Sequence, residues 1–142
     1  MKKPALFRLG AVTLLALGVS ACATSGPHGD AVPCGTPVCQ VTVTVKSCDA
    51  IIADPPVIGI LHGNTNSQIH WKLDKADGYA FTNDGVYIKE PRDDQFSKDP
   101  SGNDKLFKLK NKNSVKQTYK YGIKLKGPAG VCTLDPIIVN DM

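Results

Sequence analysis

The sequence predicts an all-β fold, a Greek-key β-sandwich of about seven strands that follows an N-terminal leader and a tether. Two observations predict this fold class. Short stretches in which apolar and polar residues alternate recur between turns that contain Gly or Pro. After the leader, no stretch of ten or more residues shows the 3.6-residue period of an amphipathic helix. The 142 residues are 42% hydrophobic and 21% charged, which suits a single domain with a buried core.

The first half of the domain contains three apolar stretches. Valines alternate with polar residues over 41–46, which predicts a strand with one buried face. A continuous apolar run follows two prolines at 57–61. Alternation returns over 69–73, and we expect Trp71 to lie in the core between the two sheets.

The middle of the chain predicts a hairpin and then a long loop. Asn83-Asp84-Gly85 stands between the apolar stretches 79–81 and 86–88, and Asp-Gly tolerates the backbone of a tight hairpin turn. Residues 90–104 contain two prolines and five acidic residues, so we interpret them as a crossing loop.

The last third of the chain predicts three more strands. The first is a short one at 106–110. The alternation over 114–126 is the clearest in the sequence, with lysines on one face and apolar residues on the other. A turn at 127–130 precedes the last strand, 131–139, which Pro136 interrupts.

The leader is typical of a secretory signal peptide. Lys2, Lys3 and Arg8 precede an apolar run from Leu9 to Val19. That run has eleven residues, fewer than the roughly 20 that span a bilayer as a helix. We therefore expect export and cleavage rather than a permanent transmembrane segment.

Val19-Ser20-Ala21-Cys22 resembles the lipobox of bacterial lipoprotein precursors. The resemblance implies cleavage before Cys22, acylation of Cys22 with fatty chains such as palmitate, and attachment to the membrane through that lipid. Ala23 after the cysteine implies, by the same resemblance, an outer-membrane lipoprotein that faces the periplasm. Alternatively, Ala21-Cys22-Ala23 fits ordinary signal peptidase, which would release a soluble secreted chain beginning at Thr24.

The predicted organisation is therefore a signal peptide over 1–21, a lipid-anchored tether over 22–37 and a β-sandwich domain over 38–142. The tether is rich in Gly, Pro, Ser and Thr, which is typical of a flexible linker.

The five cysteines fit an exported, disulfide-bridged domain. If Cys22 carries lipid, four cysteines remain for two disulfides, with three possible pairings. We favour Cys34 with Cys39, because Gly35-Thr36-Pro37 between them suits a tight turn, and Cys48 with Cys132. A four-thiolate zinc site is disfavoured because no Cys-x2-Cys pair occurs.

The charge distribution excludes one class of partner and suggests another. Three of the 17 basic residues lie in the leader, which leaves 14 against 13 acidic residues, so we predict no nucleic-acid binding. Residues 105–126 contain eight lysines and no acid. Four of these lysines are spaced along one face of the predicted strand. Their spacing predicts a cationic strip that binds an anionic envelope component, such as lipopolysaccharide phosphate, or an acidic protein. The four lysines are Lys116, Lys120, Lys124 and Lys126. Alternatively, these lysines line an exposed strand to prevent edge pairing and to keep the protein soluble.

The layout resembles immunoglobulin-like and cupredoxin-like sandwiches, but no metal site follows from it. A cupredoxin-like copper site needs two His, a Cys thiolate and usually a Met in a cluster that this sequence lacks. His62 and His70 flank a turn and form a weak candidate metal pair. The acidic residues Asp93, Asp94, Asp99 and Asp104, with Asn103, lack the spacing of a calcium loop, so we expect a solvated loop.

No catalytic motif of the Gly-x-Ser-x-Gly or His-Glu-x-x-His kind occurs, so we predict no enzymatic activity, no catalytic residues and no cofactor. The resulting hypothesis is a lipid-anchored binding or interaction module of the cell envelope. One alternative is a structural envelope lipoprotein without a saturable ligand. Another is a hydrolase that places His62 or His70 beside an acid.

Overall fold

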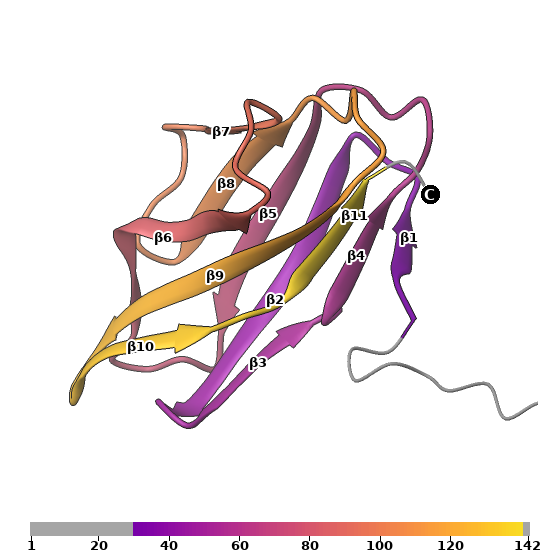
Figure 1. Ribbon diagram of the computed structural model, residues 1–142. Coiled ribbons are helices and arrows are strands. Elements are labelled where there is room, and N and C mark those ends of the chain that lie inside the picture. Colours follow the sequence, from indigo (N-terminus) through magenta and orange to yellow (C-terminus); the bar gives the residue numbers. More distant parts are fainter. Residues whose placement is uncertain (1–29, 141–142) are drawn as a thin grey trace, which may run out of the picture.

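The computed structural model describes residues 30–140, which form strands and turns and contain no helix (Figure 1). No helix able to span a bilayer therefore occurs in this range. The predicted signal peptide and Cys22 lie outside the described residues. The strands are β1 (Val32–Cys34), β2 (Val38–Ser47), β3 (Ala50–Asp54), β4 (Val57–Ile60), β5 (Ser67–Asp74), β6 (Ala80–Glu90), β7 (Phe96–Lys98), β8 (Leu106–Asn111), β9 (Thr118–Gly127), β10 (Gly130–Leu134) and β11 (Ile137–Asn140).

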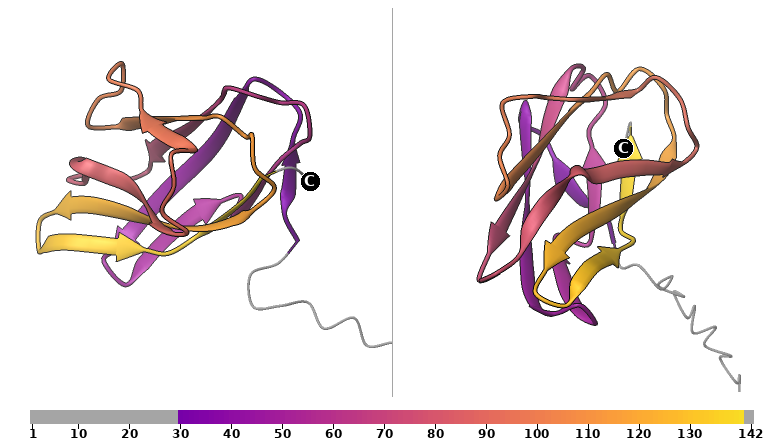
Figure 2. Two further views of the ribbon diagram at one scale, coloured as in Figure 1. Left: turned by 45° about the horizontal axis from the view of Figure 1, so that its top comes forward. Right: turned by 90° about the vertical axis from the view of Figure 1, so that its left-hand side faces the viewer.

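The strands form two mixed sheets that pack face to face, which confirms the predicted sandwich (Figure 2). Sheet A contains β1, β4, β11, β9 and β6 in this order. Strand β10 also pairs with β9, on the same edge as β11 but nearer the C-terminal end of β9. Sheet B has the order β3, β2, β5, β8 and β7. The parallel pairs are β1 with β4, β4 with β11, and β2 with β5. The outer strands β1 and β6 thus lie at opposite edges of sheet A.

The core lies between the sheets, and Trp71 is at its centre as the sequence predicts. Its side chain is fully buried on β5 and faces Tyr121 on β9 of the other sheet. The Trp71 Nε1–H donates a hydrogen bond to the Tyr121 hydroxyl at 3.1 Å, and the ring centroids lie 5.4 Å apart. This contact gives each buried polar group a partner while the rings fill the space between the sheets. Burial raises the pKa of Tyr121, so its hydroxyl stays neutral.

Both disulfides have the pairing that the sequence favours. Cys34–Cys39 joins β1 to β2, and the Cα atoms lie 5.8 Å apart. Cys48–Cys132 joins the β2–β3 turn in sheet B to β10 in sheet A, with a Cα separation of 5.0 Å. The two sheets are therefore linked covalently as well as by their core.

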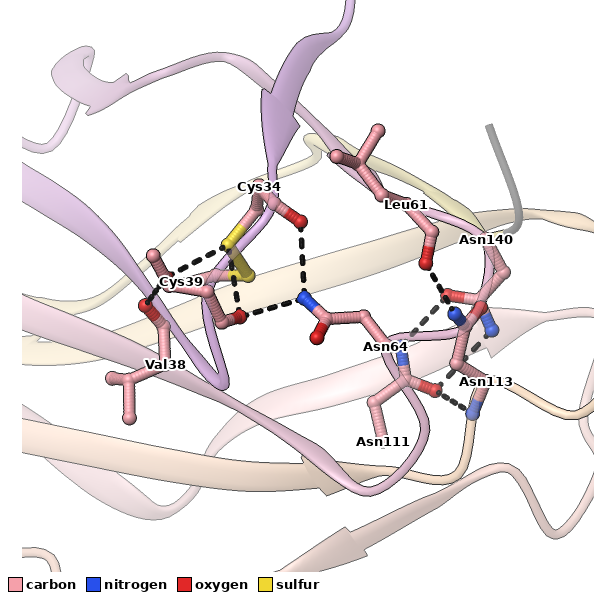
Figure 3. Close-up of a disulfide and its surroundings, with 9 residues drawn as sticks. Cys34, Val38, Cys39, Leu61, Asn64, Asn111, Asn113 and Asn140 are labelled. Carbon is pink, nitrogen blue, oxygen red and sulfur yellow. Dashed lines mark hydrogen bonds between the residues drawn. A yellow bond between two sulfur atoms is a disulfide. The ribbon is translucent and has the colours of Figure 1, made fainter.

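Asparagine side chains close the end of the sandwich next to the Cys34–Cys39 disulfide (Figure 3). The amides of Asn111 and Asn140 exchange two hydrogen bonds, at 2.7 and 3.2 Å, although both residues are fully buried. Asn113 donates to the Leu61 carbonyl, and Asn64 donates to the carbonyl of Cys34. These bonds satisfy backbone and side-chain groups where the ladders end.

The hairpin predicted at 83–85 is wrong. Strand β6 runs through this segment and pairs with β9 on both sides of it, Phe81 with Leu125 and Val86 with Ile123. Residues 82–85 therefore lie opposite Lys124 alone, and they form a bulge with three extra residues. The physical reason is that the apolar residues flanking the bulge pair with the long strand β9 rather than with each other.

The described residues form eleven strands, more than the seven or so that the sequence predicts, and the additional ones include short outer strands. Strand β3 was missed, and β7 lies within the predicted loop 90–104, where it pairs with β8. Strand β1 lies within the predicted tether, so the folded part of the chain begins before Val38.

Removing Cys48–Cys132 should destabilise the fold more than removing Cys34–Cys39. The first bond closes a loop with a sequence separation of 84 and the second a loop of only 5. Loop-closure entropy then gives losses of about 4.5 and about 2 kcal/mol. Chemical unfolding of the Cys48→Ala/Cys132→Ala and Cys34→Ala/Cys39→Ala variants measures both losses. Equal losses would contradict the expectation.

Candidate functional site

A hollow of about 460 Å³ lies between the β6 bulge and the segment that connects β7 to β8. Ligand sites for small molecules commonly have volumes of this order. We call this feature the bulge hollow. Its lining residues are Phe81, Thr82, Asn83, Lys98, Asp99, Pro100, Gly102, Asn103, Asp104, Leu106, Phe107 and Lys108.

The first wall is the β6 bulge, which hydrogen bonds hold in one conformation. The Thr82 hydroxyl donates to the Asp84 carboxylate at 2.9 Å, and Lys124 of β9 donates to the same carboxylate at 2.8 Å. At Gly85 a Cβ atom would lie only 2.8 Å from the Cβ of Phe81. Only glycine therefore lets the bulge fold back this tightly.

The second wall is the segment 98–106, which is also fixed by local bonds. The Asp99 carboxylate accepts the Ser101 N–H at 2.9 Å, and the Asn103 side-chain carbonyl accepts the Lys105 N–H at 2.8 Å. Backbone bonds join Asn103 and Leu106 in both directions. Such Asx turns give a segment without regular structure a defined shape.

Lys98 connects the two walls above an aromatic floor. The rings of Phe81 and Phe107 have centroids 5.8 Å apart and form the floor. The Lys98 ammonium lies 5.2 Å from the Phe107 ring centroid and donates to the Asn83 carbonyl at 2.6 Å. This position combines a cation–π contact with a hydrogen bond across the opening.

The polar groups of the bulge hollow are not all used within the protein. Within residues 30–140, neither the Asn83 side-chain amide nor the Asp104 carboxylate makes a hydrogen bond. Hydrogen bonds from Ser101 lower the pKa of Asp99, so this carboxylate is ionised at neutral pH. Two lysines and two aspartates line the hollow, and their formal charges cancel.

The predicted lysine strip is only partly assembled. Lys120, Lys124 and Lys126 lie on the outer face of sheet A along β9, whereas Lys116 precedes this strand and is exposed. Lys120 pairs with Glu90 at 2.6 Å, and Lys124 pairs with Asp84. Two of the four positive charges are therefore neutralised by carboxylates of β6.

The alternative interpretation of these lysines, protection of an exposed edge, is wrong for β9. This strand pairs with β6 on one edge and with β10 and β11 on the other, so it has no free edge along its paired length. Alternation in the sequence indicates a strand with one solvent-exposed face, but it does not indicate whether that strand lies at the edge or in the middle of its sheet.

The two histidines do not face each other across a hairpin. His62 follows β4 of sheet A, and His70 lies within β5 of sheet B. The His70 Nε2 is 2.9 Å from the Gln68 side-chain oxygen. Burial and the nearby Lys108 lower the pKa of His70, so the ring is neutral at pH 7.

The acidic residues of 90–104 contact separate partners. The Tyr119 hydroxyl donates to Asp93 at 2.7 Å, and Lys112 pairs with Asp94. Asp99 and Asn103 make the turns described above. Across residues 30–140, no three His, Cys, Asp or Glu side chains gather as metal ligands would.

The sequence does not predict the bulge hollow, because its walls have the patterns of a hairpin turn and a solvated loop. A signal was present in both walls. Apolar alternation stops at 82–85 and again at 98–105, and both segments contain the Asn, Asp and Gly residues that build tight turns. The packing of the two sheets brings the segments together, and the Phe81 N–H donates to the Asp104 carbonyl between them at 2.8 Å. No known family model matches the chain, and no curated protein is significantly similar to it.

The Lys124→Met variant should raise the pKa of Asp84 toward its ordinary value, because the hydrogen bond from Lys124 is the main cause of its low pKa. Carboxyl NMR titration measures this change. Since folding lowers this pKa, the stabilisation is complete above the unfolded-state pKa and is lost as the pH falls through the folded-state value.

Glu90, whose pKa is lowered by Lys120, is the matched control and should titrate as in the unmodified protein. An unchanged pKa of Asp84 in Lys124→Met would contradict the assignment of its partner.

Proposed function

We propose that the chain is a lipid-anchored binding module of the bacterial envelope, without catalytic activity, which holds its ligand in the bulge hollow. One observation carries this proposal. The chain enters the fold at β1, at one edge of sheet A, and β6 lies at the opposite edge (Figure 1). The bulge hollow adjoins β6. The fold thus separates the point of attachment from the site.

The short segment between the proposed lipid anchor and the domain keeps the domain close to the membrane. Asp30, the first described residue, stands eight residues after Cys22, so even a fully extended chain reaches at most about 28 Å. A cysteine with two or more fatty chains remains in a bilayer, whereas a single chain binds reversibly. The β1 edge is then the part of the domain nearest the point of attachment.

In this arrangement the bulge hollow is farther from the point of attachment than the β1 edge is. Four strand spacings separate β1 from β6 in sheet A, or about 19 Å. We therefore expect the ligand in the hollow to be a component of the periplasmic space. The lysines of β9 are a weaker candidate surface, because Glu90 and Asp84 neutralise two of them.

Non-reducing intact-mass analysis of the protein from its native membrane tests the anchor. We expect a chain that starts at Cys22, carries three acyl chains and is four hydrogens lighter than its reduced form. That hydrogen count follows from the two disulfides. The Cys22→Ser variant is the control and should leave the membrane fraction. An unlipidated chain starting at Thr24 would overturn the proposal in favour of a soluble secreted domain.

A further inference from the structure

We infer that the bulge hollow binds a neutral saccharide, a short stretch of an envelope glycan chain. The inference rests on the proposed function, because an envelope location is what would expose the domain to such a glycan. The kind of ligand follows from the lining residues themselves.

Charge balance favours an uncharged ligand. Lys98 and Lys108 line the hollow together with Asp99 and Asp104, so a phosphate or carboxylate group would meet as many negative charges as positive ones. Lys98 and Lys108 are also engaged, with the Asn83 carbonyl and the Ser101 hydroxyl. A polyanion is better served by a surface on which lysines lack acidic neighbours.

The unused hydrogen-bonding groups match hydroxyl groups. The Asn83 amide offers donors and an acceptor, and the Asp104 carboxylate offers acceptors only. The Lys98 ammonium has three protons and shares one with the Asn83 carbonyl. A hydroxyl both donates and accepts, so the hydroxyls of a saccharide can bind to an amide and to a carboxylate.

The apolar part of the lining suits the C–H face of a sugar ring. Pro100 is exposed, Leu106 is half-buried, and both line the hollow beside its polar groups. Sugar rings present C–H groups on one face and hydroxyls at the rim. Mixed linings of this kind, with few polar groups in fixed positions, are typical of small-molecule sites.

Both walls are fixed before any ligand arrives. The bulge is held by Thr82, Asp84 and Lys124, and the opposite wall by the Asx turns at Asp99 and Asn103. At Gly102 a Cβ atom would lie 2.5 Å from the Leu106 carbonyl oxygen, so this wall folds tightly on itself. Preformed walls reduce the entropy lost on binding, which a weakly bound sugar requires.

The test is an amide NMR titration of the full mature protein in a detergent without a sugar headgroup. Three probes are compared: an N-acetylglucosamine trimer, a neutral hexose trimer and heparin. We expect saturable shifts within 81–85 and 98–108 with at least one neutral trimer. A response to the first trimer alone indicates cell-wall glycan, and a response to the second indicates a neutral envelope polysaccharide. Heparin should leave these amides unchanged.

Asp104→Ala should weaken binding of the responding trimer at least tenfold, as expected for loss of a hydrogen bond to a charged group. Asp49→Ala is the matched control, because Asp49 is exposed on the β2–β3 turn and does not line the hollow. If neither trimer shifts these amides, if heparin shifts them instead, or if both variants bind equally, the inference fails. An absence of lipid on Cys22 would overturn the anchor and leave this result unaffected.

Discussion

Strand β9 pairs with three other strands, and the rest of the structure depends on this arrangement. One edge binds β6, and the other binds β10 and β11 in succession. Its inward side chains are fully buried, and Tyr121 among them contacts Trp71 of the opposite sheet. A shift of one residue in its register would place lysines in the core, so the alternation along β9 fixes the register of its neighbours.

The bulge hollow follows from this constraint. Strand β6 must keep Phe81 and Val86 opposite buried residues of β9, but it has three residues too many between them. Those residues do not pair with β9, and they form the bulge in β6, the edge strand of sheet A. The segment 98–106 closes the space on the other side. A defect in the pairing of the central strand is thus the source of the site.

The regular part of the fold could be predicted from the sequence, because alternation is a local signal. Residues 41–46, 69–73 and most of 114–126 are strands for this reason, and Trp71 is at the core. The pairing of the four cysteines was one of three possibilities, and the structure has the one that local features favour. Strands β3 and β7 were missed because a short outer strand is defined by its neighbour more than by its own pattern.

The site escaped prediction because its determinants are distant in the sequence. Glu90 and Asp84 stand 30 and 40 residues from the lysines that they neutralise. A strip inferred from neighbouring lysines therefore loses charge once β6 lies beside β9. The same strand pairing satisfies the Asp84 and Glu90 carboxylates of β6. The side chains of Asn83 and Asp104, whose backbone carbonyls accept from Lys98 and Phe81, make no hydrogen bond within residues 30–140. Both side chains are exposed, so a ligand can bind them in place of water. For this reason the bulge hollow, rather than the more conspicuous lysine face, is the better candidate for recognition.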